Sequence, residues 1–345
     1  MWRAWRTTRV TGALALVMAL LVLEVATRPA VAAQSSGDPH GLIAYIGEGR
    51  HSIWSILADG TEHQLWLESP DTIQDIAWSP DGTTLAYVTL GNAVGLLRVP
   101  SGVVDVIPTS SPIRGPIAFF PDGMNLVAVN GVQNDSPVCP YGELVAVSLY
   151  DGLVTPLLST GCRFSNLAVY PDGVSVLVTS NGSDPTSIVS RVDLLSLEET
   201  PLTGIFSTGL QHWSFWNAVL APDGTKIAFN DLLLSAEPGK GSLWVANPDG
   251  SDPWLTRVDE WPGCCEALSF SPNGSWLVVA LSGELAGAPE GPANDTLWAI
   301  NADFDSQGID CVQAPCVADP RLIAADLDLY EVAWQPQPLP PDAAP

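Results

Sequence analysis

Three carboxylates occupy equivalent positions in a repeated pattern and could act together. Asp75, Glu266 and Glu331 each stand five or six residues before a proline that recurs along the chain. If the repeats surround a common axis, these carboxylates approach it from three sides. Opposed carboxylates with raised pKa values support acid–base chemistry. The sequence thereby offers one functional hypothesis, a secreted hydrolase or lyase that uses carboxylates in a central channel.

A larger set of polar and aromatic residues falls at or near the same positions and suggests binding instead. It comprises Gln74, Asp75, Arg114, Arg163, Asn166, His212, Trp213, Trp216, Trp261, Glu266, Tyr330 and Glu331. Cations beside aromatic faces suit a sugar, a carboxylate-bearing ligand or a peptide. The alternative is that the tryptophans pack between structural units, which we favour for Trp216. Trp78 and Trp334 lie inside apolar runs and are expected in the core.

Motifs for catalysis or metal binding are missing from the sequence. It contains no G-x-S-x-G, H-E-x-x-H or Walker A pattern, and its four histidines are scattered. The segment Asp303–Asp310 partly imitates a calcium loop, but Ala314 stands where the loop needs a glutamate. We therefore predict no catalytic residue, no metal and no cofactor.

These residues must be positioned by a repeat. Five copies of an apolar strand, a Pro-Asp-Gly or Pro-Asn-Gly turn and a second apolar strand follow one another, and a sixth copy retains only its first strand. The motif prolines are residues 80, 121, 171, 222, 272 and 336, so the spacings are 41, 50, 51, 50 and 64 residues. A period in this range, with short apolar runs bounded by turn residues, predicts a repeat fold built of strands.

The turn residues explain the motif. Proline presets φ, the aspartate accepts hydrogen bonds from its own turn, and glycine adopts a positive φ before the next strand. The aspartates Asp81, Asp122, Asp172 and Asp223, together with Asn273, are thus expected to form turns. A shared metal-binding role is the less favoured interpretation.

Two further strands are predicted after each hairpin, which gives the four-stranded blade of a β-propeller. Leu42–Ile46 looks like the second strand of a blade whose first strand is Glu331–Gln335. Pairing these segments would complete a sixth blade and remove the exposed sheet edges. The predicted fold is all-β, a six-bladed propeller spanning residues 41–336, after a short segment at 34–40 and before a Pro-rich disordered tail at 337–345.

The six cysteines can be sorted by this fold. Loops between strands two and three, and the crossovers between blades, share one face of the ring, here called the crossover face. The Pro-Asp-Gly turns and the turns between strands three and four share the opposite face, here called the turn face. Cys139 and Cys162 are predicted to pair on the crossover face, and Cys311 pairs locally with Cys316. Cys264 and Cys265 either form a strained vicinal disulfide or remain thiols.

The motif resembles the repeats of TolB-type propellers, a WD-like group with the pattern apolar-x-apolar-S-P-D-G. The resemblance extends from Leu42 to Pro336 and implies an exported protein that binds a protein or ligand rather than one that catalyses a reaction. TolB itself is expected to carry a small α/β domain before its propeller. Here the propeller follows the N-terminal leader almost directly, so no partner contact is transferred to any residue of this chain.

The N-terminus is typical of a secretory signal peptide, predicted to span residues 1–33. Arg3, Arg6 and Arg9 precede an apolar run that is too short to span a bilayer comfortably, and Ala30–Ala33 has the small residues of a cleavage site. We expect export to the periplasm or the cell exterior, with no stable membrane insertion after cleavage. An uncleaved anchor is the alternative.

Composition narrows the possible partners. The 345 residues carry 13 Lys and Arg against 38 Asp and Glu, a formal net charge of −25. Such a surface repels phosphate backbones, so nucleic-acid binding is excluded. We predict a monomeric, non-enzymatic protein that binds a protein or a small polar ligand through its crossover face. A sensor module of a cell-surface assembly is a further possibility.

Overall fold

The structure is a computed structural model that describes residues 39–132, 143–159, 163–181, 187–202, 213–233, 241–256, 265–281, 295–302 and 321–336. The chain divides into Met1–Ser35 and Ser36–Pro345, and every described residue belongs to the second unit. All the regular elements in these ranges are β-strands. The described ranges contain no helix with the length and apolar character that crossing a membrane requires.

Each motif turn joins two antiparallel strands, as predicted. The Asp81 carboxylate accepts hydrogen bonds from the Thr83 backbone N–H at 3.0 Å and from the Ser79 hydroxyl at 2.6 Å. In the fifth copy, Asn273 accepts equivalent bonds from the Ser275 N–H at 3.1 Å and the Ser271 hydroxyl at 2.7 Å. All five motif glycines have positive φ: Gly82, Gly123, Gly173, Gly224 and Gly274. The turn-forming role of these residues is confirmed.

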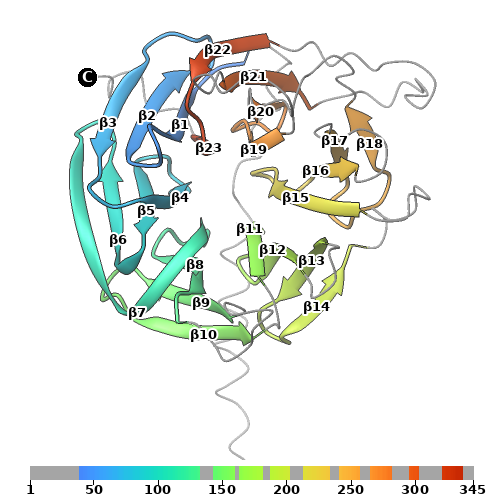
Figure 1. Ribbon diagram of the computed structural model, residues 1–345. Helices are drawn as coiled ribbons and strands as arrows, with labels where there is room; N and C mark the ends of the chain where they lie inside the picture. Colours follow the sequence, from blue (N-terminus) through green and yellow to red (C-terminus); the bar gives the residue numbers. More distant parts are fainter. Residues whose placement is uncertain are drawn as a thin grey trace, which may run out of the picture. The chain divides into compact units, whose positions relative to one another are not determined.

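The first and second blades share one long strand. A seven-stranded sheet has the order β10-β9-β8-β7-β6-β5-β4 (Figure 1). The 17-residue β7 pairs with β6 through its first half and with β8 through its second half, so it is the outer strand of one blade and the inner strand of the next. The strands are β4 (Ile73–Trp78), β5 (Thr84–Thr89), β6 (Gly91–Arg98), β7 (Val103–Phe119), β8 (Asn125–Asn130), β9 (Glu143–Ser148) and β10 (Val154–Ser159).

The third, fourth and fifth blades are separate four-stranded antiparallel sheets. The third contains β11 (Arg163–Val169), β12 (Ser175–Asn181), β13 (Ser187–Asp193) and β14 (Glu198–Pro201). The fourth contains β15 (Trp213–Leu220), β16 (Ile227–Leu233), β17 (Gly241–Ala246) and β18 (Trp254–Thr256). The fifth contains β19 (Cys265–Phe270), β20 (Trp276–Leu281), β21 (Asp295–Asn301) and β22 (Arg321–Leu327).

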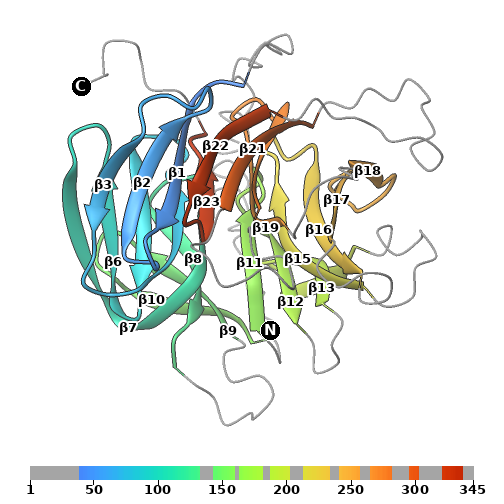
Figure 2. The ribbon, with the colours of Figure 1, turned by 45° about the horizontal axis from the view of Figure 1, so that its top comes forward.

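The sixth blade is composite, as predicted. Its order is β23-β1-β2-β3, formed by β23 (Glu331–Trp334), β1 (Leu42–Gly47), β2 (Ser52–Leu57) and β3 (Gln64–Glu68). Ile43 pairs with Trp334 and Ile46 with Glu331 in an antiparallel register. The two ends of the propeller sequence thus supply parts of one sheet, and this closes the ring (Figure 2).

On the turn face, each of several motif turns contacts the motif turn of the preceding blade. An added Cβ on Gly123 would meet Pro80, one on Gly173 would meet Pro121, and one on Gly224 would meet Pro171. The first turn receives a hydrogen bond from the sixth blade, because the Gln335 side-chain amide donates to the Gly82 carbonyl at 2.7 Å. These contacts place the motif turns side by side on one face, as the sorting by face requires.

The core lies between adjacent blades. One cluster joins the fifth and sixth blades through Trp276, Val278, Val332 and Trp334, all nearly inaccessible to solvent. Trp78 is also buried, and its indole N–H donates to the Ala333 carbonyl of the neighbouring blade at 3.0 Å. The predicted packing roles of Trp78 and Trp334 are confirmed.

Candidate functional site

The inner strand of each of the first five blades breaks register at a similar position. The breaks fall between Ile73 and Asp75, Arg114 and Ala118, Phe164 and Asn166, Trp216 and Val219, and Cys265 and Ala267. β-Bulges re-aim side chains and are common beside functional sites. The repeat therefore contains a built-in irregularity at the positions from which the candidate binding residues were chosen.

Most of these residues belong to the opening residues of inner strands, next to the register breaks, and not to the crossovers themselves. Gln74 and Asp75 lie in β4, Arg114 in β7, Arg163 and Asn166 in β11, Trp213 and Trp216 in β15, Glu266 in β19, and Glu331 in β23, with Tyr330 just before it.

Several of the predicted residues cannot be placed further. The side chains of Arg163, Trp213, Trp216 and Glu266 lie outside what the structure describes, as do His212 and Trp261 entirely. The same holds for the cysteines: Cys139, Cys162, Cys264, Cys311 and Cys316 fall outside the described residues, and only the backbone of Cys265 is described. The disulfide pairings, including the alternatives for Cys264 and Cys265, stay predictions, and so does the interpretation of Asp303–Asp310.

Asp75 is buried where the first two blades meet. Its Oδ1 accepts a hydrogen bond from the Ile76 backbone N–H at 2.8 Å, and its Oδ2 accepts one from the Ile117 N–H at 2.6 Å. Gly115 is required beside it, because an added Cβ would lie 2.7 Å from the Cβ of Asp75. The side chain of Asp75 thus ties the inner strand of one blade to that of the next.

Arg50 brings a positive charge to the same place. It lies in the loop between β1 and β2, and its Nη2 donates to the Gln74 carbonyl at 3.4 Å. Its guanidinium carbon lies 5.2 Å from the centre of the Tyr330 ring, a cation–π arrangement. Its Nε is buried and has no hydrogen-bond partner among the described residues. A buried donor without a partner is costly, and such groups commonly mark sites that a water or a ligand completes.

Glu331 supplies a second carboxyl group to this cluster. Burial raises the pKa of Asp75 to about 7, although the N–H donors of Ile117 and Ile76 and the charge of Arg50 act in the opposite direction. The pKa of Glu331 is raised well above its usual range, first by burial and then by repulsion from Asp75, against the opposing effects of the Val332 N–H and Arg50. Because the charge of Asp75 raises the pKa of Glu331, the protonation of the two carboxyl groups is linked.

We call Arg50, Gln74, Asp75, Tyr330 and Glu331 the closure cluster, because it lies where the composite sixth blade meets the first. Four of its members were chosen from the sequence, and Arg50 was missed. The sequence could have identified Arg50, because it lies in the loop between the second and third strands of the sixth blade, and such loops belong to the crossover face. A protonated carboxyl beside a guanidinium presents hydrogen-bond donors and acceptors together, which suits a polar ligand.

The described ranges contain no group of three or more His, Cys, Asp or Glu side chains arranged to hold a metal ion.

Comparisons with known proteins identify the fold. No protein-family model matches the chain. TolB from Acinetobacter baumannii is similar with a TM-score of 0.64 and 21% identity, over 87% of this chain and 68% of that one. A protein assigned as TolB from Agrobacterium tumefaciens is similar with a TM-score of 0.60 and 14% identity, over 87% and 95% of the two chains. Kuenenia stuttgartiensis hydrazine synthase is similar with a TM-score of 0.55 and 14% identity, over 83% and 84%. The chain has the β-propeller fold of TolB proteins, and at these identities the likeness concerns the fold alone.

Proposed function

We propose that this TolB-like propeller is an exported binding protein that recognises a protein or a small polar ligand through its crossover face, without catalysis. Export, to the periplasm or the cell exterior, rests on the N-terminal sequence. The observation that carries the binding proposal is the closure cluster, in which a buried arginine donor without a described partner adjoins two buried carboxyl groups whose pKa values are raised.

The arrangement of the bulges supports the same face. The register breaks of five inner strands fall at similar positions in each blade, so a common backbone frame carries different residue types there. Rigid scaffolds that display variable residues are typical of binding surfaces. The strong negative charge of the chain favours partners with positive or neutral surfaces.

A hydrolase or lyase is the second candidate. The raised pKa values of Asp75 and Glu331 favour it, because carboxyl groups with raised pKa values support acid–base chemistry. We favour binding because both oxygens of Asp75 already accept backbone hydrogen bonds. A general base needs an oxygen that can face the substrate. In the catalytic hypothesis, Glu331 would therefore carry the chemistry.

A capture experiment tests the binding proposal. The purified chain is used to capture partners from the exported-protein fraction of the source organism, and wild type is compared with the double variant Arg163→Ala/Trp213→Ala. We expect the double variant to recover at least tenfold less partner than wild type does, because both residues are predicted to belong to the binding surface of the crossover face. Leu195→Ala, a change at an exposed residue of the turn face, serves as the control and should retain capture.

The catalytic alternative has its own readout. Wild type and Glu331→Gln are compared on panels of ester and glycoside substrates. Turnover by wild type that disappears in Glu331→Gln would replace the binding proposal with the enzyme. Undiminished capture by Arg163→Ala/Trp213→Ala would reject the crossover face as the binding surface.

A further inference from the structure

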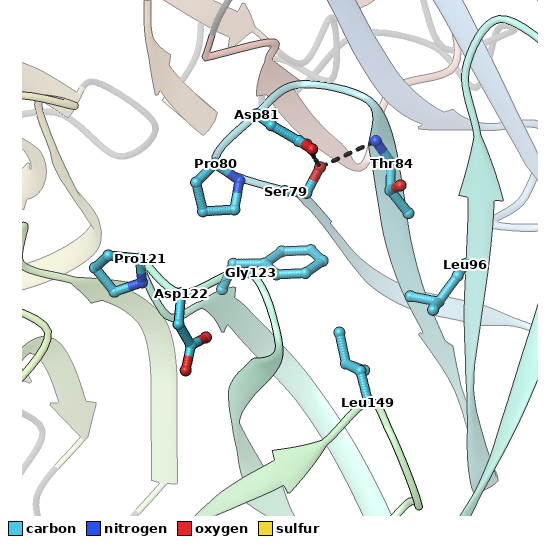
Figure 3. A pocket seen from close by; sticks show the side chains of 10 residues that line it. Ser79, Pro80, Asp81, Thr84, Leu96, Pro121, Asp122, Gly123 and Leu149 are labelled. Carbon is cyan, nitrogen blue, oxygen red and sulfur yellow. Dashed lines mark hydrogen bonds between the residues drawn. The ribbon is translucent and has the colours of Figure 1, made fainter.

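A pocket opens on the turn face, opposite the closure cluster. It has a volume of about 290 Å³ and lies between the Pro-Asp-Gly turns of the first and second blades. Figure 3 shows Pro80 and Pro121 of the two turns on one side and Leu96 and Leu149 on the other. Together with Phe119, these residues supply the apolar part of the lining, and Ser79 and Thr84 contribute to a polar part.

Two carboxylates also line the pocket, and none of its lining residues is basic. Asp81 and Asp122 belong to the two turns that flank it. Burial acts to raise the pKa of Asp81, but the hydrogen bonds from Ser79 and Thr83 outweigh it and the net shift is downward. Asp81 is therefore ionised at neutral pH. A lining that combines apolar side chains with carboxylates suits an apolar group that carries a positive charge beside it.

The size of the pocket restricts what it can hold. About 290 Å³ is just below the range of about 300–1,000 Å³ that is usual for sites of drug-sized molecules and cofactors. The pocket instead has room for one or two amino-acid side chains. This points to a segment of a protein as the occupant.

The surface around the pocket extends the apolar character. Leu149 lines the pocket, and its N–H donates to the carbonyl of Met124 at 2.9 Å, which joins the pocket to the turns of the second blade. In those turns Met124 is 69% exposed, Tyr150 94% and Leu153 54%. Exposed tyrosine and methionine side chains are typical of protein-binding surfaces. Asp151 stands between Tyr150 and Leu153 and adds a further negative charge.

We propose that this pocket and the adjoining turns of the second blade form a second binding site, which takes a segment of a partner protein with a lysine or arginine next to an apolar residue. The apolar side chain lies against the exposed parts of Phe119, Leu96 and Leu149, and the basic side chain lies against Asp81 and Asp122. Charge complementarity selects this occupant, since the chain has a net charge of −25 and the pocket is lined by acidic but no basic residues. The site is independent of the crossover face.

The fold offers a way to remove the charges without disturbing the turns. Asn273 occupies the aspartate position of the fifth turn and makes the same turn hydrogen bonds. Asp81→Asn/Asp122→Asn should therefore fold like wild type. The matched control is Asp223→Asn/Asp249→Asn, which removes two turn aspartates from the fourth blade, away from the pocket. Thermal unfolding checks that both variants are folded.

The probe is a short fluorescent peptide that alternates lysine with phenylalanine and leucine, and fluorescence anisotropy at low salt measures its binding to the full chain. We expect the pocket variant to weaken binding about tenfold, and the control by less than about twofold, because only the pocket carboxylates touch the peptide. Leu149→Ala should also weaken binding, whereas Leu195→Ala should not. A peptide with glutamate in place of lysine should not bind.

Four results would overturn the proposal. The first is a wild-type chain that does not bind the basic peptide. The second is equal weakening in the pocket variant and the control, which would show that only the overall charge attracts the peptide. The third is n-butylamine competing as well as the peptide does, which would indicate a site for free amines. The fourth is a wild-type dimer in sedimentation that the pocket variant abolishes, which would make a second copy of this chain the occupant.

Discussion

Asp75 combines a structural role with an unusual protonation equilibrium. Its two oxygens bond to backbone N–H groups of two inner strands, and its burial raises its pKa to about 7. The pKa of Glu331 is raised as well, because Glu331 is buried and is repelled by the charge of Asp75. In the folded protein both groups therefore hold protons at pH values where the unfolded chain has released them.

The sign of the resulting pH dependence follows from these directions. A carboxyl group whose folded pKa is raised contributes stability below its unfolded pKa of about 4, and this contribution disappears as the pH rises through the folded pKa. We expect the free energy of unfolding to fall between about pH 4 and pH 7, with a slope approaching 1.4 kcal/mol per pH unit for each group that titrates. Urea unfolding at a series of pH values measures this dependence of the free energy of unfolding on pH.

Substitution identifies the groups responsible. Asp75→Asn/Glu331→Gln should be less stable than wild type at acid pH, because the side-chain amide introduced by Asp75→Asn turns a donor toward a backbone N–H and costs about 1–3 kcal/mol. Its stability should nevertheless be much flatter between about pH 4 and pH 7. Asp223→Asn, in an exposed turn, should leave the wild-type slope unchanged. A double variant with the full wild-type slope would show that other groups cause it.

At the scale of the element, β23 is a short strand on which the whole ring depends. It pairs with β1, and Val332 and Trp334 are buried in the cluster that joins the fifth and sixth blades. The indole N–H of Trp334 also donates to the His40 carbonyl at 3.1 Å. Without β23, β1 would become an unpaired edge in a ring whose closure removes such edges.

Removal of β23 should therefore be severe. Deletion of residues 331–345 exposes β1 and loses the burial of Trp334, which alone is worth about 3–5 kcal/mol. We expect loss of the cooperative unfolding transition and aggregation, measured by circular dichroism and light scattering. Deletion of residues 337–345 leaves every described strand in place and should retain the wild-type transition. A stable monomer after the longer deletion would contradict the closure of the ring by β23.

At the scale of the whole molecule, negative charge opposes folding and attracts partners. The 38 acidic residues against 13 basic ones produce a repulsive field, which ion pairs such as Arg98–Asp105 and Arg191–Asp172 offset only locally. Salt screens such a field. The same screening weakens the attraction of a basic partner, so salt should act on stability and on binding with opposite signs.

The opposite effects of salt on stability and on binding can be measured. Raising sodium chloride from about 0.02 M to about 0.5 M should raise the melting temperature by about 2 °C or more, since self-repulsion is screened. Over the same range, binding of the lysine-containing peptide should weaken. Sodium chloride is preferred to sulfate, which stabilises proteins through exclusion from their surface. A melting temperature that falls with salt would show that attractive pairs outweigh the repulsion.

The sequence by itself determined the fold and its closure. Pro-Asp-Gly turns have local chemistry that specifies a hairpin wherever they occur, and their repetition gave the blades. The incomplete ends at Leu42–Ile46 and Glu331–Gln335 predicted the composite sixth blade. The same repeat grouped Gln74, Asp75, Tyr330 and Glu331 on one face, because equivalent positions in a closed ring share a face.

Tertiary structure alone decided which side chains meet. The bulges of the inner strands, the approach of Arg50 to Tyr330, and the burial that raises the pKa of Asp75 all depend on packing between blades. The pocket between Pro80, Phe119 and Leu149 likewise belongs to two blades at once. Local sequence encodes turns and strands, whereas distances across blades follow from how neighbouring sheets pack together.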